Sequence, residues 1–135
     1  MDPLTIITTG WSVFKLGYDV IKFINTEFPE NDLDHFRVFV SNEYHAPIYV
    51  AIHYSLRGIW QTTAWKIESG QTGLLLGDSY QMKNRIIYAY ACNNDISREW
   101  TGNEKYSENI SGHKREFGEM ELGDRYCNYT IDIGA

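Results

Sequence analysis

The spacing of apolar residues changes once along this chain, close to residue 36. Up to residue 26 the polar positions recur three or four residues apart, as on one side of an α-helix: Ser12, Lys15, Asp19, Lys22 and Thr26. The apolar positions between them cover more than half of the helix circumference. Asp2 suits the cap of such a helix, and Pro3 suits its first turn. The pattern predicts an amphipathic α-helix over residues 2–26, within a first segment of residues 1–26.

A short acidic segment, residues 27–35, follows the expected helix. Four of its nine residues are Asp or Glu, and Pro29 ends a helix because its ring removes a backbone donor. We expect this segment to be a linker and residues 36–135 to be a separate domain.

From residue 36 apolar and polar positions alternate, as in half-buried strands. Alternation is strongest in residues 85–92, where Ile86, Tyr88, Tyr90 and Cys92 share one face. Turn-forming residues recur every eight to twelve positions, while residues 101–113 are polar enough to predict an irregular loop. We expect an antiparallel β-sandwich of seven to nine strands. The residues expected in its core are Val38, Val50, Ile52, Ile67, Leu75, Tyr88, Tyr90 and Ile131.

The net charge of the chain limits the classes of molecule that we expect it to bind. The formal net charge of −6 argues against nucleic acid as a partner, because nucleic-acid binding needs a basic surface. The same charge removes a general attraction to anionic lipid, although an acidic protein can carry a local basic patch. The two cysteines, Cys92 and Cys127, are expected as free thiols inside the cell, whereas export would favour a disulfide.

The sequence contains no recognisable motif of an enzyme active site. None of the four histidines is paired at a metal-ligand spacing, and neither a nucleophile motif nor a phosphate-binding loop is present. We therefore expect a protein that is not an enzyme and that needs no metal and no cofactor. The first residues lack the basic start and cleavage motif of a signal peptide, which favours a cytoplasmic protein or one exported by a non-classical route.

Aromatic residues make up 15% of the chain and suggest either core or ligand contacts. The residues chosen as a possible ligand face are Trp60, Tyr80 and Trp100, which would stack on a glycan or on a protein partner.

The predicted helix offers three further interpretations: packing on its own domain, insertion into a lipid surface as in pore-forming proteins, or packing against copies of itself. Its broad apolar face and its glycines favour self-assembly into an oligomer or filament. The main hypothesis is therefore a structural or interaction module. A membrane-active protein is the first alternative, and a glycan-binding module is the second. The residues expected to carry association are Trp11, Val13, Phe14, Leu16, Gly17, Val20, Ile21 and Ile24.

Residues 36–134 also resemble a known but uncharacterised family of mostly bacterial domains, domain-of-unknown-function family one-zero-three-six. The segments that carry the resemblance are Val38 to Asn42, Pro47 to Ile52, Trp60, Trp65 to Gln71, Asn84 to Ala91, Trp100 to Gly102 and Ile131 to Gly134. The resemblance implies a compact β-fold and no particular activity, and residues 2–26 lie outside it.

Overall fold

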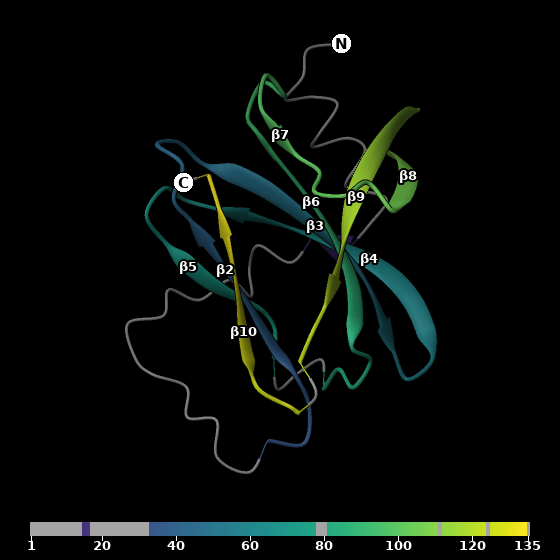
Figure 1. The fold of residues 1–135 in the computed structure, drawn as a ribbon. Coiled ribbons are helices and arrows are strands. Elements are labelled where there is room, and N and C mark those ends of the chain that lie inside the picture. The colour runs from purple at the N-terminus through teal and green to yellow at the C-terminus, as the bar shows by residue number, and fades with distance from the viewer. Residues whose placement is uncertain (1–14, 17–32, 78–80, 111, 124, 135) are drawn as a thin grey trace.

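The computed structural model describes residues 15–16, 33–77, 81–110, 112–123 and 125–134, which form two β-sheets and contain no helix (Figure 1). The prediction of a mainly β domain is confirmed. The larger sheet contains β1 (Lys15–Leu16), β3 (Ile48–Leu56), β4 (Ile59–Ile67), β6 (Ile86–Asn93), β7 (Glu99–Trp100), β8 (Tyr106–Ile110) and β9 (His113–Glu121). The smaller sheet contains β2 (Arg37–Asn42), β5 (Thr72–Leu76) and β10 (Asn128–Ile133).

Strand order departs from the all-antiparallel arrangement that the sequence predicted. The larger sheet runs β1-β4-β3-β6-β9-β8, with β7 also paired to β6, and the smaller runs β10-β2-β5. Two of the pairs are parallel, β10 with β2 and β1 with β4. Parallel neighbours need a long connection, and β2 and β10 are separated by nearly the whole domain. Alternation within a strand carries no information about the direction of its neighbour.

The main core lies between the two sheets. In β3 the even-numbered residues, such as Val50 and Ile52, face the smaller sheet, and they meet Val40 from β2 and Ile131 from β10. Trp65 from β4 is fully buried in the same cluster. Burial of these side chains supplies the main driving force for joining the sheets.

A second, smaller cluster lies on the opposite face of the larger sheet. It contains Ala51, Ala64, Tyr90, Cys92, Ile110 and Phe117. The larger sheet is curled around this cluster, since Thr62 of β4 contacts Glu108 of β8 although these strands lie far apart in the sheet order. We call this face, toward which β8 returns, the outer face.

Strand β8 corrects the prediction of an irregular loop over residues 101–113. Tyr106, Glu108 and Ile110 alternate with Ser107 and Asn109, and β8 pairs with β9 in antiparallel register. The strand is polar on one face and carries a carboxylate on the other. Its hydrophobic alternation is therefore too weak to be recognised from the sequence.

Seven of the eight residues expected in the core are buried, and Tyr88 is half-buried. Tyr88 and Tyr90 share a face, as predicted, but it is the outer face. The main core receives Ile87, Ala89 and Ala91 from the same strand. Both cysteines are free; Cys92 is buried and Cys127 is half-buried.

The amphipathic helix expected over residues 2–26 lies outside the described residues, apart from Lys15 and Leu16. These two residues form β1, whose backbone pairs with Thr63 and Ala64 at the edge of β4. The predicted helix as a whole stays a prediction. An unpaired strand edge competes with helix formation for backbone hydrogen bonds. No helix in the described part of the chain is long and apolar enough to span a membrane.

Candidate functional site

A stack of aromatic rings lies on the outer face, close to the turn between β3 and β4. The His53 ring is sandwiched between Trp60 and Tyr106, with centroid distances of 5.0 and 4.2 Å and interplanar angles of 18° and 10°. Tyr88 packs obliquely on Trp60 and Tyr106, at 5.8 and 5.1 Å. The four rings come from β3, β4, β6 and β8, and we call them the aromatic stack. They touch one another, so they form a packed group and not an open cage.

Hydrogen bonds among Thr62, Glu108, Tyr106 and His53 hold the aromatic stack in place. The Thr62 hydroxyl donates to Glu108 Oε1 at 3.0 Å, and the Tyr106 hydroxyl donates to the same oxygen at 2.8 Å. Because the Thr62 proton is used in this way, His53 Nδ1, at 2.8 Å from the Thr62 oxygen, must carry the proton and donate it. His53 is thereby held in one tautomer and one ring orientation.

Burial decides the charge of His53. Desolvation lowers its pKa below the ordinary value of 6.5, and the nearby Glu108 carboxylate opposes this effect only in part. The imidazole is therefore neutral at pH 7. Burial, together with the hydrogen bond to Glu108, raises the pKa of Tyr106, so its hydroxyl stays protonated.

The large apolar side chains that are exposed gather at this end of the domain. Among the described residues they are Ile59, Trp60 and Ile86, which are 67%, 45% and 36% exposed. Ser55 lies directly opposite Trp60 in the β3–β4 ladder. The register that pairs His53 with Tyr88 brings Ile86 to the other side of Ser55 on the outer face. Trp60 and Ile86 therefore flank Ser55 on the outer face, whereas Ile59, paired with Leu56 at the end of the hairpin, points to the other face of β4.

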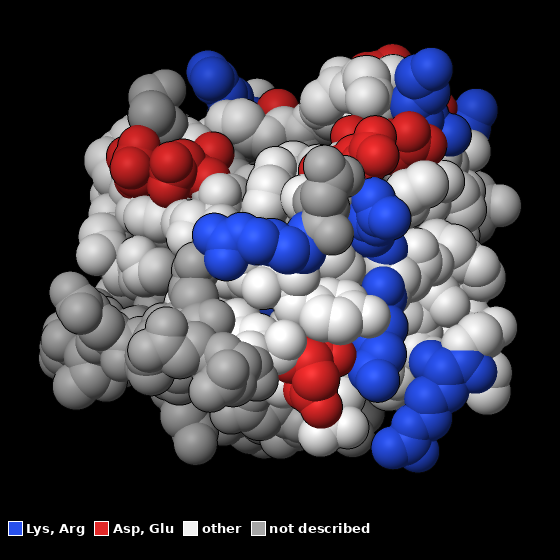
Figure 2. Space-filling view, turned by 60° about the horizontal axis from the view of Figure 1, so that its bottom comes forward, with Lys and Arg blue, Asp and Glu red and all other residues white. Residues whose placement is uncertain are grey.

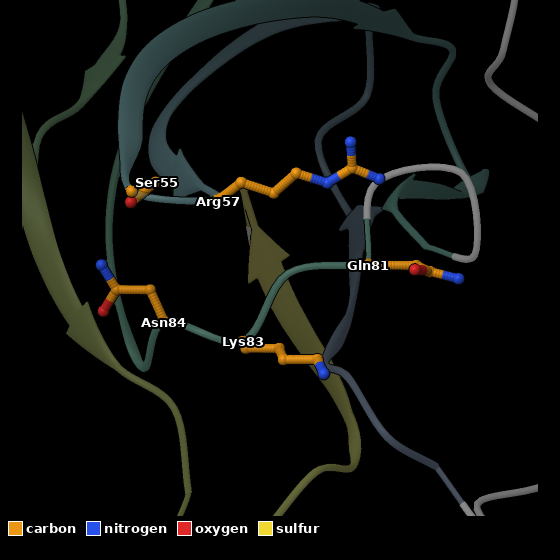
Figure 3. Close-up of a pocket in the computed structure, with 6 residues that line it drawn as sticks. Ser55, Arg57, Gln81, Lys83 and Asn84 are labelled. Atoms are coloured by element: carbon orange, nitrogen blue, oxygen red, sulfur yellow. The ribbon is translucent and has the colours of Figure 1, made fainter.

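A pocket of about 320 Å³ adjoins these apolar side chains. It is lined by Ser55, Arg57, Gly58, Gln81, Lys83 and Asn84. In Figure 3 the Arg57 side chain comes from the β3–β4 turn and the Lys83 side chain from the segment before β6, and both extend in the same direction. Ser55 and Asn84 face each other at the other side of the pocket. We call this the cationic pocket, because the charged residues that line it in the described part of the chain, Arg57 and Lys83, are both basic.

The backbone at the pocket is unusual. Arg57 and Gly58 both have positive φ, 55° and 81°, and they join Leu56 to Ile59 as a two-residue hairpin turn. Gln81 also has a positive φ, 32°. Side chains other than glycine seldom adopt this conformation, and such strain is often found at binding sites.

Figure 2 looks onto this end of the molecule. Lys and Arg side chains form a band across the centre and right of the view, while Asp and Glu side chains lie in separate groups above and below it. A protein with a net charge of −6 thus has a basic region at one end. We call the cationic pocket with Ile59, Trp60 and Ile86 the end face.

The sequence singled out only part of this site. Trp60 belongs to it, whereas Tyr80 lies outside the described residues. Trp100 packs edge-on against Tyr44 at 5.1 Å and joins the main core, so it does not share a face with Trp60. The expected association residues other than Leu16 also lie outside the described part. Arg57 and Lys83 were missed, although Arg57-Gly58 was identifiable as a turn between two strands.

The described residues contain no group of three His, Cys, Asp or Glu side chains that could hold a metal ion. Donors and apolar surface at the end face instead suit non-covalent binding. A scan of protein-family models, a search of curated proteins and a search of solved structures each found no match to this chain.

Proposed function

We propose that this protein is a membrane-surface binding module, which attaches to phospholipid through the end face. The observation that carries the proposal is the coincidence of two features at one end: the three exposed large apolar side chains of the described chain, and a pocket lined by Arg57 and Lys83. Lipid surfaces offer the matching pair, an apolar layer below a layer of phosphates.

Trp60 is well suited to the boundary between these layers. Tryptophan combines a large apolar ring with one polar N–H, which explains its enrichment at membrane interfaces. Here the ring is held on His53, so little conformational freedom is lost when it enters lipid. Preorganisation of this kind strengthens binding without adding a contact.

The expected strength is modest and reversible. Large apolar side chains contribute about 1.5–3 kcal/mol each when fully buried, and these three are already partly covered. Each basic side chain near an anionic surface adds about 1 kcal/mol. Neither contribution alone holds a protein on a membrane, but the two together do so.

In the membrane hypothesis drawn from the sequence, residues 2–26 insert into lipid. The present proposal assigns the contact with lipid to the end face. Self-association through residues 1–26 stays a prediction. Glycan binding through Trp60 is the competing use of the same ring.

Co-sedimentation with vesicles tests the function. The full chain should pellet with vesicles of phosphatidylcholine mixed with an anionic phospholipid, and Trp60→Ser should weaken this binding about tenfold or more. Trp100→Phe, at the aromatic residue on the opposite face, is the matched control and should bind as the wild type does. Dye retention in the same vesicles is expected, because attachment at a surface does not open a pore.

The proposal fails if the wild-type protein stays in the supernatant with every vesicle composition. It also fails if Trp60→Ser binds as well as the wild type. Binding of a soluble glycan that depends on Trp60, with no vesicle binding, would assign the ring to carbohydrate.

A further inference from the structure

Among the described residues that line it, the cationic pocket presents hydrogen-bond donors and no acidic side chain. Arg57 and Lys83 are exposed, and no carboxylate of the described residues lies within ion-pair distance of either one. The Asp34 carboxylate interacts only weakly with Lys83. Its pKa is lowered first by its hydrogen bond to His35, and the charge of Lys83 is the smallest of the causes. Both cations are therefore available to a ligand.

The neutral lining residues add donors to the two cations. The Asn84 side-chain oxygen accepts the backbone N–H of Ile86 at 3.1 Å, which leaves the amide nitrogen to donate. In Figure 3 this nitrogen lies on the side of Ser55, whose hydroxyl also lines the pocket. Ser55 is only 6% exposed, so a ligand that reaches its hydroxyl has entered the pocket.

Two positive charges and several neutral donors match a doubly charged oxyanion. A guanidinium binds two oxygens of one phosphate, an ammonium supplies a point charge, and hydroxyl and amide donors complete the shell. A phosphate monoester carries a charge of about −1.5 to −2 at pH 7, with three free oxygens. A phosphodiester carries one charge and two free oxygens, and it leaves one of the cations without a counter-charge.

We propose that the cationic pocket binds a phosphate monoester, and that the lipid recognised at the end face bears one on its headgroup. The second half of this inference rests on the proposed membrane function, while the first half concerns the pocket alone. The volume of about 320 Å³ accommodates a phosphate with part of the group that carries it. Ile59, Trp60 and Ile86 then lie beside the acyl chains.

Vesicles of equal surface charge separate this inference from general attraction to anionic lipid. We expect binding about tenfold tighter to vesicles with phosphatidic acid, a monoester, than to vesicles with phosphatidylglycerol, a diester, at matched zeta potential. Arg57→Asn and Lys83→Gln should each abolish most of this preference. Asparagine is favoured in the turn conformation of residue 57, so loss of binding in that variant is not explained by unfolding. Lys114→Gln, at an exposed lysine of β9, is the control and should keep the preference.

Soluble inorganic phosphate tests the pocket without a membrane. Titration followed by ¹H–¹⁵N NMR should shift the amide signals of Ser55, Gly58 and Asn84 and leave those of β9 unchanged. Binding should strengthen as the pH rises through the second pKa of inorganic phosphate, where the ligand gains its second negative charge.

The outcomes are distinguishable. Equal binding to the two anionic vesicles overturns the headgroup assignment and leaves the membrane function standing. Phosphate shifts at the pocket without vesicle binding support the pocket site and overturn the membrane function. Absence of phosphate shifts, or shifts that persist in Arg57→Asn and Lys83→Gln, overturns the pocket site.

Discussion

The backbone conformation of Arg57 is unfavourable for arginine, whereas its side chain is suited to binding an anion. Its φ of 55° belongs to the left-handed region, where a non-glycine side chain other than Asn or Asp costs about 1–2 kcal/mol. The two-residue turn that it forms with Gly58 most often has asparagine at this position. An arginine here reduces stability, and its presence is explained if the side chain has a role in binding.

Replacing Arg57 with Asn should therefore stabilise the fold while it weakens binding. We expect the free energy of unfolding to rise by about 1 kcal/mol, because asparagine tolerates the left-handed conformation. Thermal denaturation followed by circular dichroism measures the change. A lower melting temperature for Arg57→Asn would show that the arginine side chain contributes to stability and would contradict this explanation.

His53 is the titrating residue of the aromatic stack, and its pKa has two opposing causes. Desolvation lowers it, and the Glu108 carboxylate, 3.9 Å from Nδ1, raises it in part. Glu108→Gln should therefore lower the pKa of His53 further, while the amide oxygen still accepts the Thr62 hydroxyl. NMR titration of the His53 ring protons provides the measurement. An unchanged or higher pKa would show that the carboxylate does not act on the imidazole.

The same pKa fixes the sign of a stability change. Below the ordinary pKa of 6.5 the unfolded chain binds a proton at His53 that the folded chain resists. His53 therefore lowers the stability of the fold as the pH falls through 6.5 toward the depressed value of the folded state. In Glu108→Gln this pH window should extend further into acid.

At the scale of elements, a close contact of backbones holds the β8–β9 hairpin in place. A Cβ atom added at Gly118 of β9 would lie 2.9 Å from the carbonyl oxygen of Thr101 and 3.0 Å from the Cα of Gly102. Both neighbours are backbone atoms, which cannot move without shifting the loop after β7. Asn103 of the same loop makes two further hydrogen bonds to the backbone of Glu119.

Gly118→Ala should destabilise the protein by about 1–3 kcal/mol, because the added methyl group must displace this loop. Gly123→Ala is the matched control, since an added Cβ there meets no atom within 4 Å. Chemical denaturation of both variants compares their unfolding free energies. Equal values would show that the loop yields without cost.

The elements also show how far the sequence could predict the fold. Alternation identified strands such as residues 48–54, where one face is apolar, because burial of that face leaves a period of two in the sequence. Alternation failed to identify β8, because the covered face of this strand includes Glu108, and a glutamate in a sequence normally indicates a solvent-exposed position. Alternation also could not tell which face of β6 meets the smaller sheet, because both faces of that strand are largely covered.

Candidate-site residues were harder to predict for a related reason. Trp60 could be selected because aromatic side chains are candidates for ligand contact wherever they lie in a sequence. Arg57 and Lys83 lie 26 positions apart in separate turns and meet only through the fold. A single arginine or lysine in a turn is ordinary, so no local pattern indicated a pocket.

At the scale of the whole molecule, charge and shape predict one orientation on a membrane. The net charge of −6 disfavours approach to an anionic surface by most faces, whereas the end face presents Arg57 and Lys83. The β7 strand, which carries Trp100, lies at the opposite end in Figure 1. Trp65 is fully buried between the sheets. Of these three tryptophans, only Trp60 should reach lipid.

Fluorescence quenching by brominated phospholipids measures this orientation. Quenching should be strong in the wild-type protein, nearly absent in Trp60→Phe and retained in Trp100→Phe, since bromine quenches an indole only at close contact. Trp11→Phe separates the end face from the segment that the sequence singled out first. If Trp11→Phe loses the quenching and Trp60→Phe keeps it, the N-terminal segment inserts into lipid and the end face does not. If only Trp60→Phe loses the quenching, the domain of two sheets supplies the contact with lipid. The position of the cationic pocket then determines how the protein is oriented on the membrane.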